Sequence, residues 1–252
     1  MNVRQEQPEV NIEHAKMLLS KAAKNGADVL ILPETWNTGF FPKSNLDMLS
    51  DKNGETVKAL LEEISRTYEV FVVGGSVSVN ENGKIFNTCY IYNEKGELVS
   101  SYRKTHLFSP MNEHLYFTAG DSLCTFSVGD TKAAVMICYD LRFPEIARRL
   151  ALSGAEILFI PAQWPKERIQ QMEILLKARA VENQMYTVLC NAVGTFDGTV
   201  FGGHSTLCDP FGNALSIQSE DEEILYCEAD IDLVSSVRRK INVFADRREE
   251  LY

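Results

Sequence analysis

The chain has 252 residues, of which 45% are apolar, and this is enough to bury the core of one large α/β domain. Its formal net charge of −10 argues against a nucleic-acid partner. The sequence predicts no signal peptide and no membrane span. Its six cysteines have no CxxC or metal-type spacing and its four histidines are scattered, so we expect reduced thiols, a cytoplasmic protein and no metal site.

The predicted elements alternate between helices and short buried strands. Helical spacing of apolar residues predicts helices at 11–25, 54–68, 145–152, 169–183 and 233–239. Apolar or alternating runs predict strands at 28–32, 70–79, 86–92, 98–102, 123–128, 132–138, 156–161, 186–192, 205–208, 214–218 and 224–229. Because no repeat or linker is visible, residues 1–252 are expected to form a single domain, with 230–252 as a charged C-terminal tail. The pattern alone indicates a mixed α/β fold with both sheet faces covered.

The stretch around Cys138 is the most informative part of the chain. Five apolar residues at 133–137 run directly into Cys138, as in a buried parallel strand, and Pro144 suits the first turn of a helix. Cys138 is therefore predicted at a strand–helix junction, where backbone N–H groups favour a thiolate and can hold an oxyanion. The alternative is a buried structural cysteine, which is the ordinary role of a free cysteine.

Two more strand ends carry charged side chains. Glu34 follows the strand predicted at 28–32, and Lys104 follows the strand predicted at 98–102. A cysteine, a carboxylate and an ammonium group together suit acyl transfer, because they supply a nucleophile, a proton relay and an oxyanion partner. Each group also has a simpler interpretation, since Glu34 could be an exposed loop carboxylate and Lys104 a solvated surface residue.

Several segments, taken together, resemble the nitrilase superfamily of carbon–nitrogen hydrolases. The family's three catalytic motifs are matched, in order and at its usual separations, by residues 32–34 (LPE), 102–108 (YRKTHLF) and 137–145 (ICYDLRFPE). Further matches at 177–184, 203–205 and 209–212 extend the resemblance over nearly the whole chain. The omega-amidase branch of the superfamily is resembled by three segments: the sequence after Cys138, the loop at 163–165 and the C-terminal residues 243–252. Enzymes of this branch hydrolyse the terminal amide of 2-oxo acids such as 2-oxoglutaramate and 2-oxosuccinamate.

The resemblance implies a four-layer αββα sandwich, usually paired sheet to sheet in a homodimer, and a cysteine-dependent amidase that needs no cofactor. Cys138 would be the nucleophile, and Glu34 would act first as general base and then as general acid. Lys104 would stabilise the oxyanion together with the backbone N–H of Tyr139. Glu113 would hydrogen-bond Lys104 and steer the substrate. Attack on the amide would expel ammonia and leave a thioester, which water activated by Glu34 would hydrolyse to the acid.

If these residues form a Glu-Lys-Cys site, each group alters the protonation of its neighbours. Two neighbouring carboxylates raise each other's proton affinity, and an adjacent ammonium group stabilises a thiolate. Two residues are candidates for binding the rest of the substrate. Arg142 could hold a substrate carboxylate, although the nearby Asp140 and Glu145 favour a structural ion pair. Trp164 could form a wall of the pocket or have an ordinary packing role.

The beginning of the sequence departs from the family pattern. Members normally start with an apolar strand, and here residues 1–3 lie where that strand would end. We therefore expect the N-terminal strand to be missing or truncated, which would leave neighbouring strands unpaired. Another member of the superfamily, such as a carbamoylase, a deaminated-glutathione amidase or a nitrilase, is the alternative to an omega-amidase. A non-catalytic sandwich protein and a redox-sensing thiol protein are the alternatives from other classes.

Overall fold

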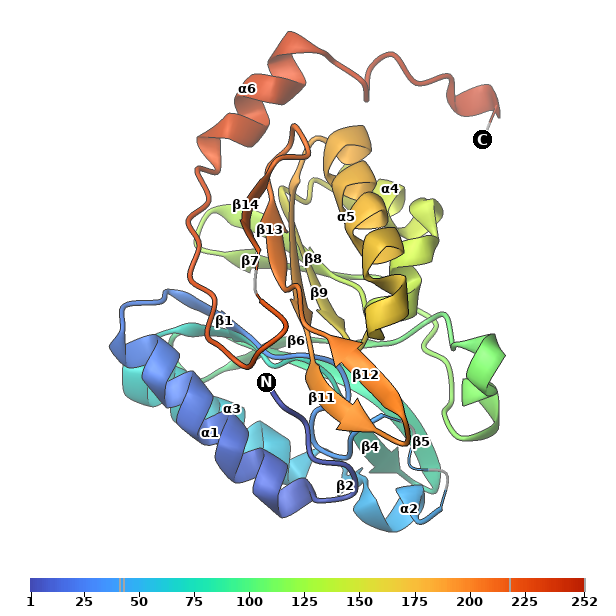
Figure 1. Cartoon of the computed structure of the whole chain (residues 1–252). Coiled ribbons are helices and arrows are strands. Elements are labelled where there is room, and N and C mark those ends of the chain that lie inside the picture. The colour runs from blue at the N-terminus through green and yellow to red at the C-terminus, as the bar shows by residue number, and fades with distance from the viewer. Residues whose placement is uncertain (41, 43, 218, 252) are drawn as a thin grey trace.

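The computed structural model describes residues 1–40, 42, 44–217 and 219–251. Two six-stranded sheets pack face to face between two layers of helices (Figure 1). The predicted four-layer αββα sandwich is therefore confirmed. Within the described residues, no helix combines the length and the apolar character that crossing a membrane requires.

The first sheet is built from the N-terminal half of the chain. Its strands run in the order β1 (Val29–Ile31), β3 (Phe71–Val73), β5 (Lys84–Tyr92), β4 (Val77–Glu81) and β2 (Asp51–Lys52), and β6 (Leu98–Arg103) also pairs with β5. Helices α1 (Pro8–Lys24) and α3 (Glu55–Tyr68) cover its outer face, and the short α2 (Leu46–Leu49) precedes β2. The apolar residues of α3 recur every three or four positions, so that one side of this helix is buried against the sheet.

The second sheet follows in the C-terminal half. Its order is β14 (Ala214–Ile217), β13 (Thr206–Cys208), β10 (Tyr186–Asn191), β9 (Ile157–Ala162), β8 (Thr131–Val135) and β7 (Cys124–Val128). Helices α4 (Pro144–Leu152) and α5 (Ile169–Asn183) cover its outer face. A separate hairpin comprises β11 (Val193–Phe196) and β12 (Thr199–Gly202), and α6 (Asp232–Lys240) lies in the C-terminal segment. Short 3₁₀ helices are η1 (Ser109–Met111), η2 (Glu113–Leu115), η3 (Cys138–Arg142), η4 (Lys166–Arg168) and η5 (Glu249–Leu251).

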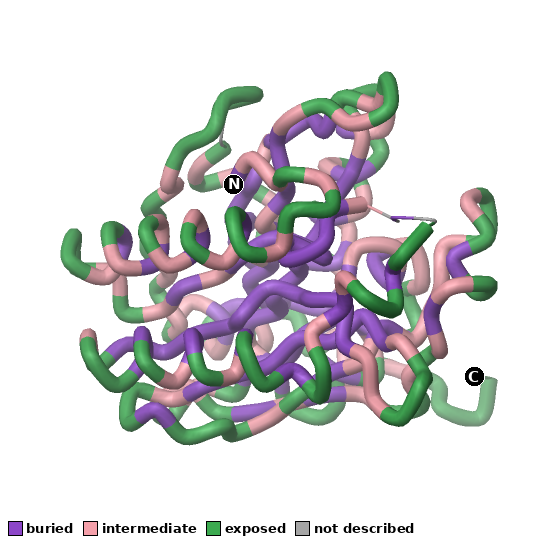
Figure 2. Tube along the Cα trace, turned by 90° about the horizontal axis from the view of Figure 1, so that it is seen from below, coloured by how far each residue is buried: buried purple, intermediate pink, exposed green. Residues whose placement is uncertain are grey.

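The inner faces of the two sheets form a shared apolar core. Phe71 of the first sheet stacks on Phe126 of the second, with ring centroids 5.8 Å apart, and Phe126 stacks on Phe159. Val73, Ile91 and many other side chains with almost no exposed surface fill the same layer. Figure 2 shows the buried residues concentrated in the centre of the molecule and the exposed residues on the outer helices and turns. Because this layer is close-packed, it fixes the position of one sheet relative to the other.

Most predicted elements are present, with three differences. The strand predicted at 70–79 is two strands, β3 and β4, because the chain turns at Gly74 and Gly75. Gly75 has φ +65°, and a Cβ atom there would lie 2.4 Å from the carbonyl oxygen of Pro33, so only glycine fits. The β11–β12 hairpin was not predicted. The predicted strand end Gln218 and the tail residue Tyr252 lie outside the described residues.

The third difference is that no strand forms at 224–229. These residues and the unpaired edge of β1 line a cavity of about 1150 Å³, most of whose lining is apolar. Among the described residues no strand precedes α1; Asn2 forms a single parallel bridge with Val193. The strand at 224–229 was predicted from the composition of the segment alone. A strand forms only beside another strand that pairs with it, and here the space beside the segment is the cavity.

An apolar strand placed in this cavity is expected to stabilise the fold. A variant with five or six alternating Val and Ile residues added before Met1 would pair with β1 and bury apolar surface. We expect its melting temperature to rise by about 5 °C in differential scanning calorimetry, since burial of several such side chains outweighs the cost of ordering them. An extension of equal length made of Ser and Gly is the control. Equal melting temperatures for the two extensions would contradict the prediction.

Candidate active site

The carboxyl ends of strands from both sheets meet at one place and deliver polar side chains there. Glu34 and Lys104 follow β1 and β6 of the first sheet, while Cys138 and Gln163 follow β8 and β9 of the second. All four line one small pocket. The structure thus brings together the three residues that the sequence analysis selected and adds Gln163, which it did not. A site at the carboxyl ends of buried strands is typical of α/β proteins.

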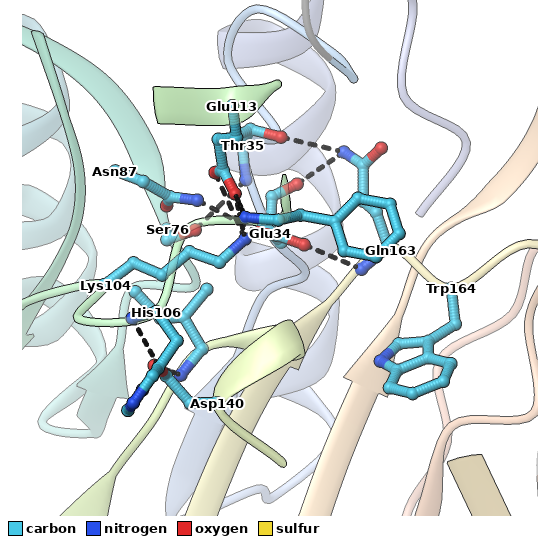
Figure 3. Close-up of polar contacts among 12 residues, drawn as sticks. Glu34, Thr35, Ser76, Asn87, Lys104, His106, Glu113, Asp140, Gln163 and Trp164 are labelled. Carbon is cyan, nitrogen blue, oxygen red and sulfur yellow. Dashed lines mark hydrogen bonds and ion pairs between the residues drawn. The ribbon is translucent and has the colours of Figure 1, made fainter. Parts of the chain in front are cut away.

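Lys104 lies between two buried carboxylates (Figure 3). Its Nζ is 2.8 Å from Oε1 of Glu34 and 2.9 Å from Oε2 of Glu113. The three side chains are at most 2% exposed. The predicted contact between Glu113 and Lys104 is therefore present. Glu113 also accepts a hydrogen bond from the backbone N–H of Phe108, which anchors the loop that carries it.

Both carboxylate oxygens of Glu34 are held by hydrogen bonds. Oε1 accepts from Nδ2 of Asn87 at 2.9 Å in addition to Lys104, and Oε2 accepts from the backbone N–H of Gln163 at 3.1 Å. The Gln163 side-chain amide donates to the backbone carbonyl of Glu34, and the Glu34 N–H donates to Ala162. Because Gln163 and Ala162 belong to the second sheet, the orientation of the Glu34 carboxylate depends on the contact between the sheets. Asn87 is a polar residue within an apolar strand, and this contrast could have identified it as a site residue from the sequence.

Cys138 opens the 3₁₀ helix η3 with φ +44°, a left-handed conformation that non-glycine residues rarely adopt. Its thiol is within hydrogen-bonding reach of the Glu34 carboxylate and of the Gln163 backbone N–H. The predicted strand at 132–138 ends at Val135, so Cys138 begins a turn and not an α-helix; α4 starts only at Pro144. The strained turn directs the sulfur toward the base.

A buried aspartate fixes this turn. Asp140 is fully buried, and its Oδ2 accepts hydrogen bonds from the Ile137 N–H at 3.0 Å and the Tyr102 hydroxyl at 2.8 Å. Its Oδ1 accepts from the backbone N–H of His106 at 2.9 Å. The His106 ring stacks on Phe143 with centroids 3.6 Å apart. Asp140 therefore joins the loop after Lys104 to the loop after Cys138.

The electrostatics of the site differ from one expectation. Burial raises the pKa of the Cys138 thiol well above its ordinary value, the Glu34 charge raises it further, and Lys104 lowers it only in part. Lys104 does favour the thiolate, as expected, but burial and the Glu34 charge outweigh it, so the net shift is opposite to the expected one. Burial alone would lower the pKa of Lys104, but Glu34 and Glu113 outweigh it and raise that pKa well above its ordinary value. Burial also raises the pKa of Glu113.

The pocket above this cluster has a volume of about 90 Å³. Trp164, which is 3% exposed, forms part of its wall, and no acceptor pairs with its buried indole Nε1–H within the described chain. The guanidinium of Arg142 lies 4.7 Å from the Trp164 ring centroid and donates to Oε1 of Gln171 at 2.8 Å. The remaining lining residues are Phe40, Phe108, Met111, Tyr139, Pro165, Glu167, Arg168 and Thr199.

The structure does not support the structural role expected for Arg142. Among the described residues it forms no ion pair with Asp140 or Glu145 and instead lines the pocket. Tyr139 lies beside the nucleophile, and its N–H as an oxyanion donor stays a prediction. Within the same residues, no three His, Cys, Asp or Glu side chains are placed to hold a metal ion.

Comparison with known proteins matches the sequence of this chain to one family. The family model for carbon–nitrogen hydrolases matches residues 1–239. The chain belongs to the carbon–nitrogen hydrolase family. It is thus a hydrolase of carbon–nitrogen bonds other than peptide bonds.

The similar proteins include enzymes and solved structures of this carbon–nitrogen hydrolase family. The chain is 41% identical to "2-oxoglutaramate amidase" of Bacillus subtilis (strain 168), over 97% of the chain and 94% of that protein. It is 30% identical to human "Omega-amidase NIT2", over 96% of the chain and 91% of that protein. The crystal structure of Saccharomyces cerevisiae Nit3, described as a member of branch 10 of the nitrilase superfamily, has a TM-score of 0.89 at 28% identity, covering 98% of this chain and 93% of that one.

The raised thiol pKa gives a prediction about Glu34. Replacing Glu34 with Gln removes a negative charge beside Cys138, so the thiol pKa falls and the thiolate forms at lower pH. The rate of Cys138 alkylation by iodoacetamide should therefore rise at a lower pH in Glu34→Gln than in the wild type. The measurement is the pH profile of Cys138 modification, read by peptide mass. The exposed Glu145→Gln is the control, and a Glu34→Gln profile shifted upward would refute the assignment.

Proposed function

We propose that this protein hydrolyses the terminal amide of a small 2-oxo acid, of the 2-oxoglutaramate or 2-oxosuccinamate type, to the acid and ammonia. The observation that carries the proposal is the buried group of Cys138, Glu34 and Lys104 beneath a pocket to which Arg142 contributes an unneutralised guanidinium. This combination suits an amide whose far end carries a carboxylate. The names of the relatives at 30% and 41% identity support the same substrate class.

In the first half of the reaction, the Cys138 sulfur attacks the amide carbonyl carbon while its proton passes to Glu34. The thiol is neutral at rest and already faces this carboxylate, so deprotonation accompanies attack. The negative charge that develops on the carbonyl oxygen is stabilised by Lys104 Nζ and the Tyr139 N–H. When the carbon–nitrogen bond breaks, Glu34 returns its proton to the leaving nitrogen, and ammonia departs from a thioester.

In the second half, Glu34 takes a proton from a water molecule that attacks the thioester carbon. The carbon–sulfur bond then breaks, the acid leaves, and the Cys138 sulfur recovers its proton. Lys104 stays charged through both halves, because the two carboxylates hold its pKa high, and so it supplies a fixed charge and not a proton. Glu113 fixes the ammonium from its second side and completes the catalytic set.

The proposal also includes the rest of the substrate and the assembly. Arg142 would pair with the substrate carboxylate, and Trp164 would form the wall along its carbon chain. We further propose a cytoplasmic homodimer that binds neither nucleic acid nor membrane. Exposed apolar side chains on α5 and the nearby turn, among them Ile174, Val181 and Phe211, are suited to such pairing.

Ammonia release tests the reaction directly. The wild type should release ammonia from 2-oxoglutaramate or 2-oxosuccinamate but not from glutamine, asparagine or a simple nitrile. Cys138→Ala and Glu34→Gln should each retain below about one per cent of turnover with circular dichroism unchanged. Activity on none of these amides in a folded protein would point to another substrate of the superfamily. Carbon dioxide release together with ammonia would identify a carbamoylase.

Trp164 provides a separate test of the pocket wall. Trp164→Ala removes a buried aromatic surface along the substrate chain, so KM for the oxo-acid amide should rise about tenfold with a smaller change in kcat. Steady-state kinetics measures this split. Trp36→Phe, a change at a buried tryptophan that does not line the pocket, is the control. Unchanged kinetics in Trp164→Ala would assign the residue a packing role only.

A further inference from the structure

A second guanidinium lies at the mouth of the catalytic pocket. Arg168 ends the 3₁₀ helix η4, is half-buried, and lines the same pocket as Cys138 and Arg142. Its Cζ is 5.3 Å from the ring centroid of Phe108, a stacking contact that orients the planar group. Neither Arg168 nor Arg142 forms an ion pair with any carboxylate in the described part of the chain.

Some other arginines of the protein, in contrast, are paired with carboxylates. Arg103 pairs with Glu81 and Arg179 pairs with Glu182, as expected in a chain with 35 acidic and 25 basic residues. In a molecule with a surplus of carboxylates, two guanidinium groups that line one pocket and form no ion pair within the described residues are available to a ligand.

The other charges around the pocket leave its mouth positive. At the floor, Glu34 and Glu113 more than neutralise Lys104, so the positive charge of the pocket lies only at its mouth. At the mouth, Arg142 and Arg168 face one acid, the exposed Glu167. The aromatic walls of Phe108 and Trp164 limit solvent screening, so an anion entering the pocket is attracted more strongly than at an open surface.

We propose that Arg168 is a specificity-determining residue that binds the anionic end of the substrate together with Arg142. The two planar guanidinium groups, both stacked on pocket aromatics, would share the oxygens of a carboxylate while the amide carbon lies at Cys138. The Nε1–H of Trp164 is buried and has no acceptor among the described residues, and Figure 3 shows the indole nitrogen on the side of the ring nearer the catalytic cluster. The pocket therefore selects anionic amides over neutral ones. The identity of that anion as a 2-oxo acid rests on the proposed function.

Two alkylating agents of nearly equal size test the subsite without assuming any substrate. Iodoacetate is anionic and iodoacetamide is neutral. In each, the Cys138 sulfur attacks the CH₂ carbon and forms an S–C bond as the C–I bond breaks, so that iodide leaves and the thiol proton passes to base. The measurement is the ratio of their rates at Cys138, read by the mass of the Cys138 peptide because Cys227 is also exposed. Dividing one rate by the other cancels changes in thiol reactivity and isolates attraction for the negative charge.

We expect Arg168→Gln to lower the iodoacetate-to-iodoacetamide ratio about tenfold, and Arg168→Lys to retain part of it. Glu167→Gln should raise the ratio, because it removes the acid at the mouth. Arg149→Gln, the same change at an exposed arginine of α4 outside the pocket, should leave it unchanged. The proposal is overturned if the ratio in Arg168→Gln equals that of the wild type, or if Arg149→Gln lowers it equally.

Substrate kinetics separate this proposal from the proposed function. With 2-oxoglutaramate, Arg168→Gln should raise KM about tenfold while kcat changes little, because the carboxylate lies away from the reacting carbon. A lowered alkylation ratio in an enzyme that does not hydrolyse 2-oxoglutaramate would retain the anion subsite and reject the oxo-acid amide. An unchanged ratio in an enzyme that hydrolyses it would reject the role of Arg168 alone.

Discussion

The buried ion cluster of Lys104 with Glu34 and Glu113 is the interaction on which the active site depends. Two negative charges and one positive charge lie in a region with almost no solvent contact. Removal of charges from water is expensive, and here it is offset by short contacts and by hydrogen bonds that reach both carboxylates. Loss of Lys104 would leave two buried carboxylates without a counter-charge, so the ammonium group is the member on which the cluster depends.

The residues of the active site and the groups that hold the ion cluster come from both sheets of the sandwich. The first sheet supplies Glu34 and Lys104, and the second supplies Cys138 and the backbone N–H of Gln163 that orients the Glu34 carboxylate. The aromatic contacts between Phe71, Phe126 and Phe159 hold the sheets together near the site. Backbone strain at Cys138 is maintained by Asp140, whose five hydrogen bonds or ion contacts immobilise the turn. Packing and catalysis thus use the same interface.

The sequence predicted the strand ends well, because continuous apolar runs before Glu34 and Cys138 have few other interpretations. The αββα layering came from the family resemblance, since periodicity alone gave only mixed α/β. The contacts of Gln163 and Asn87 with Glu34 were missed because they depend on which segments meet in space. The net pKa shift of the Cys138 thiol could not be predicted, because burial, which no local pattern reports, outweighs the ammonium group. The prediction of a strand at 224–229 was wrong for a similar reason, since a strand must pair with a neighbouring strand and the local sequence does not report one.

The open edge of β1 has a consequence for how the enzyme responds to heat. This strand has three residues, has β3 as its one partner among the described residues, and borders the large cavity on its other side. Elements with few neighbours open at a lower free-energy cost than the whole molecule unfolds. Glu34 follows β1 after two residues, so local opening of this strand displaces the base that we propose for catalysis. Heating will therefore inactivate the enzyme reversibly below the temperature at which the sandwich itself melts, with amide hydrogen exchange fastest at the edge that carries the base.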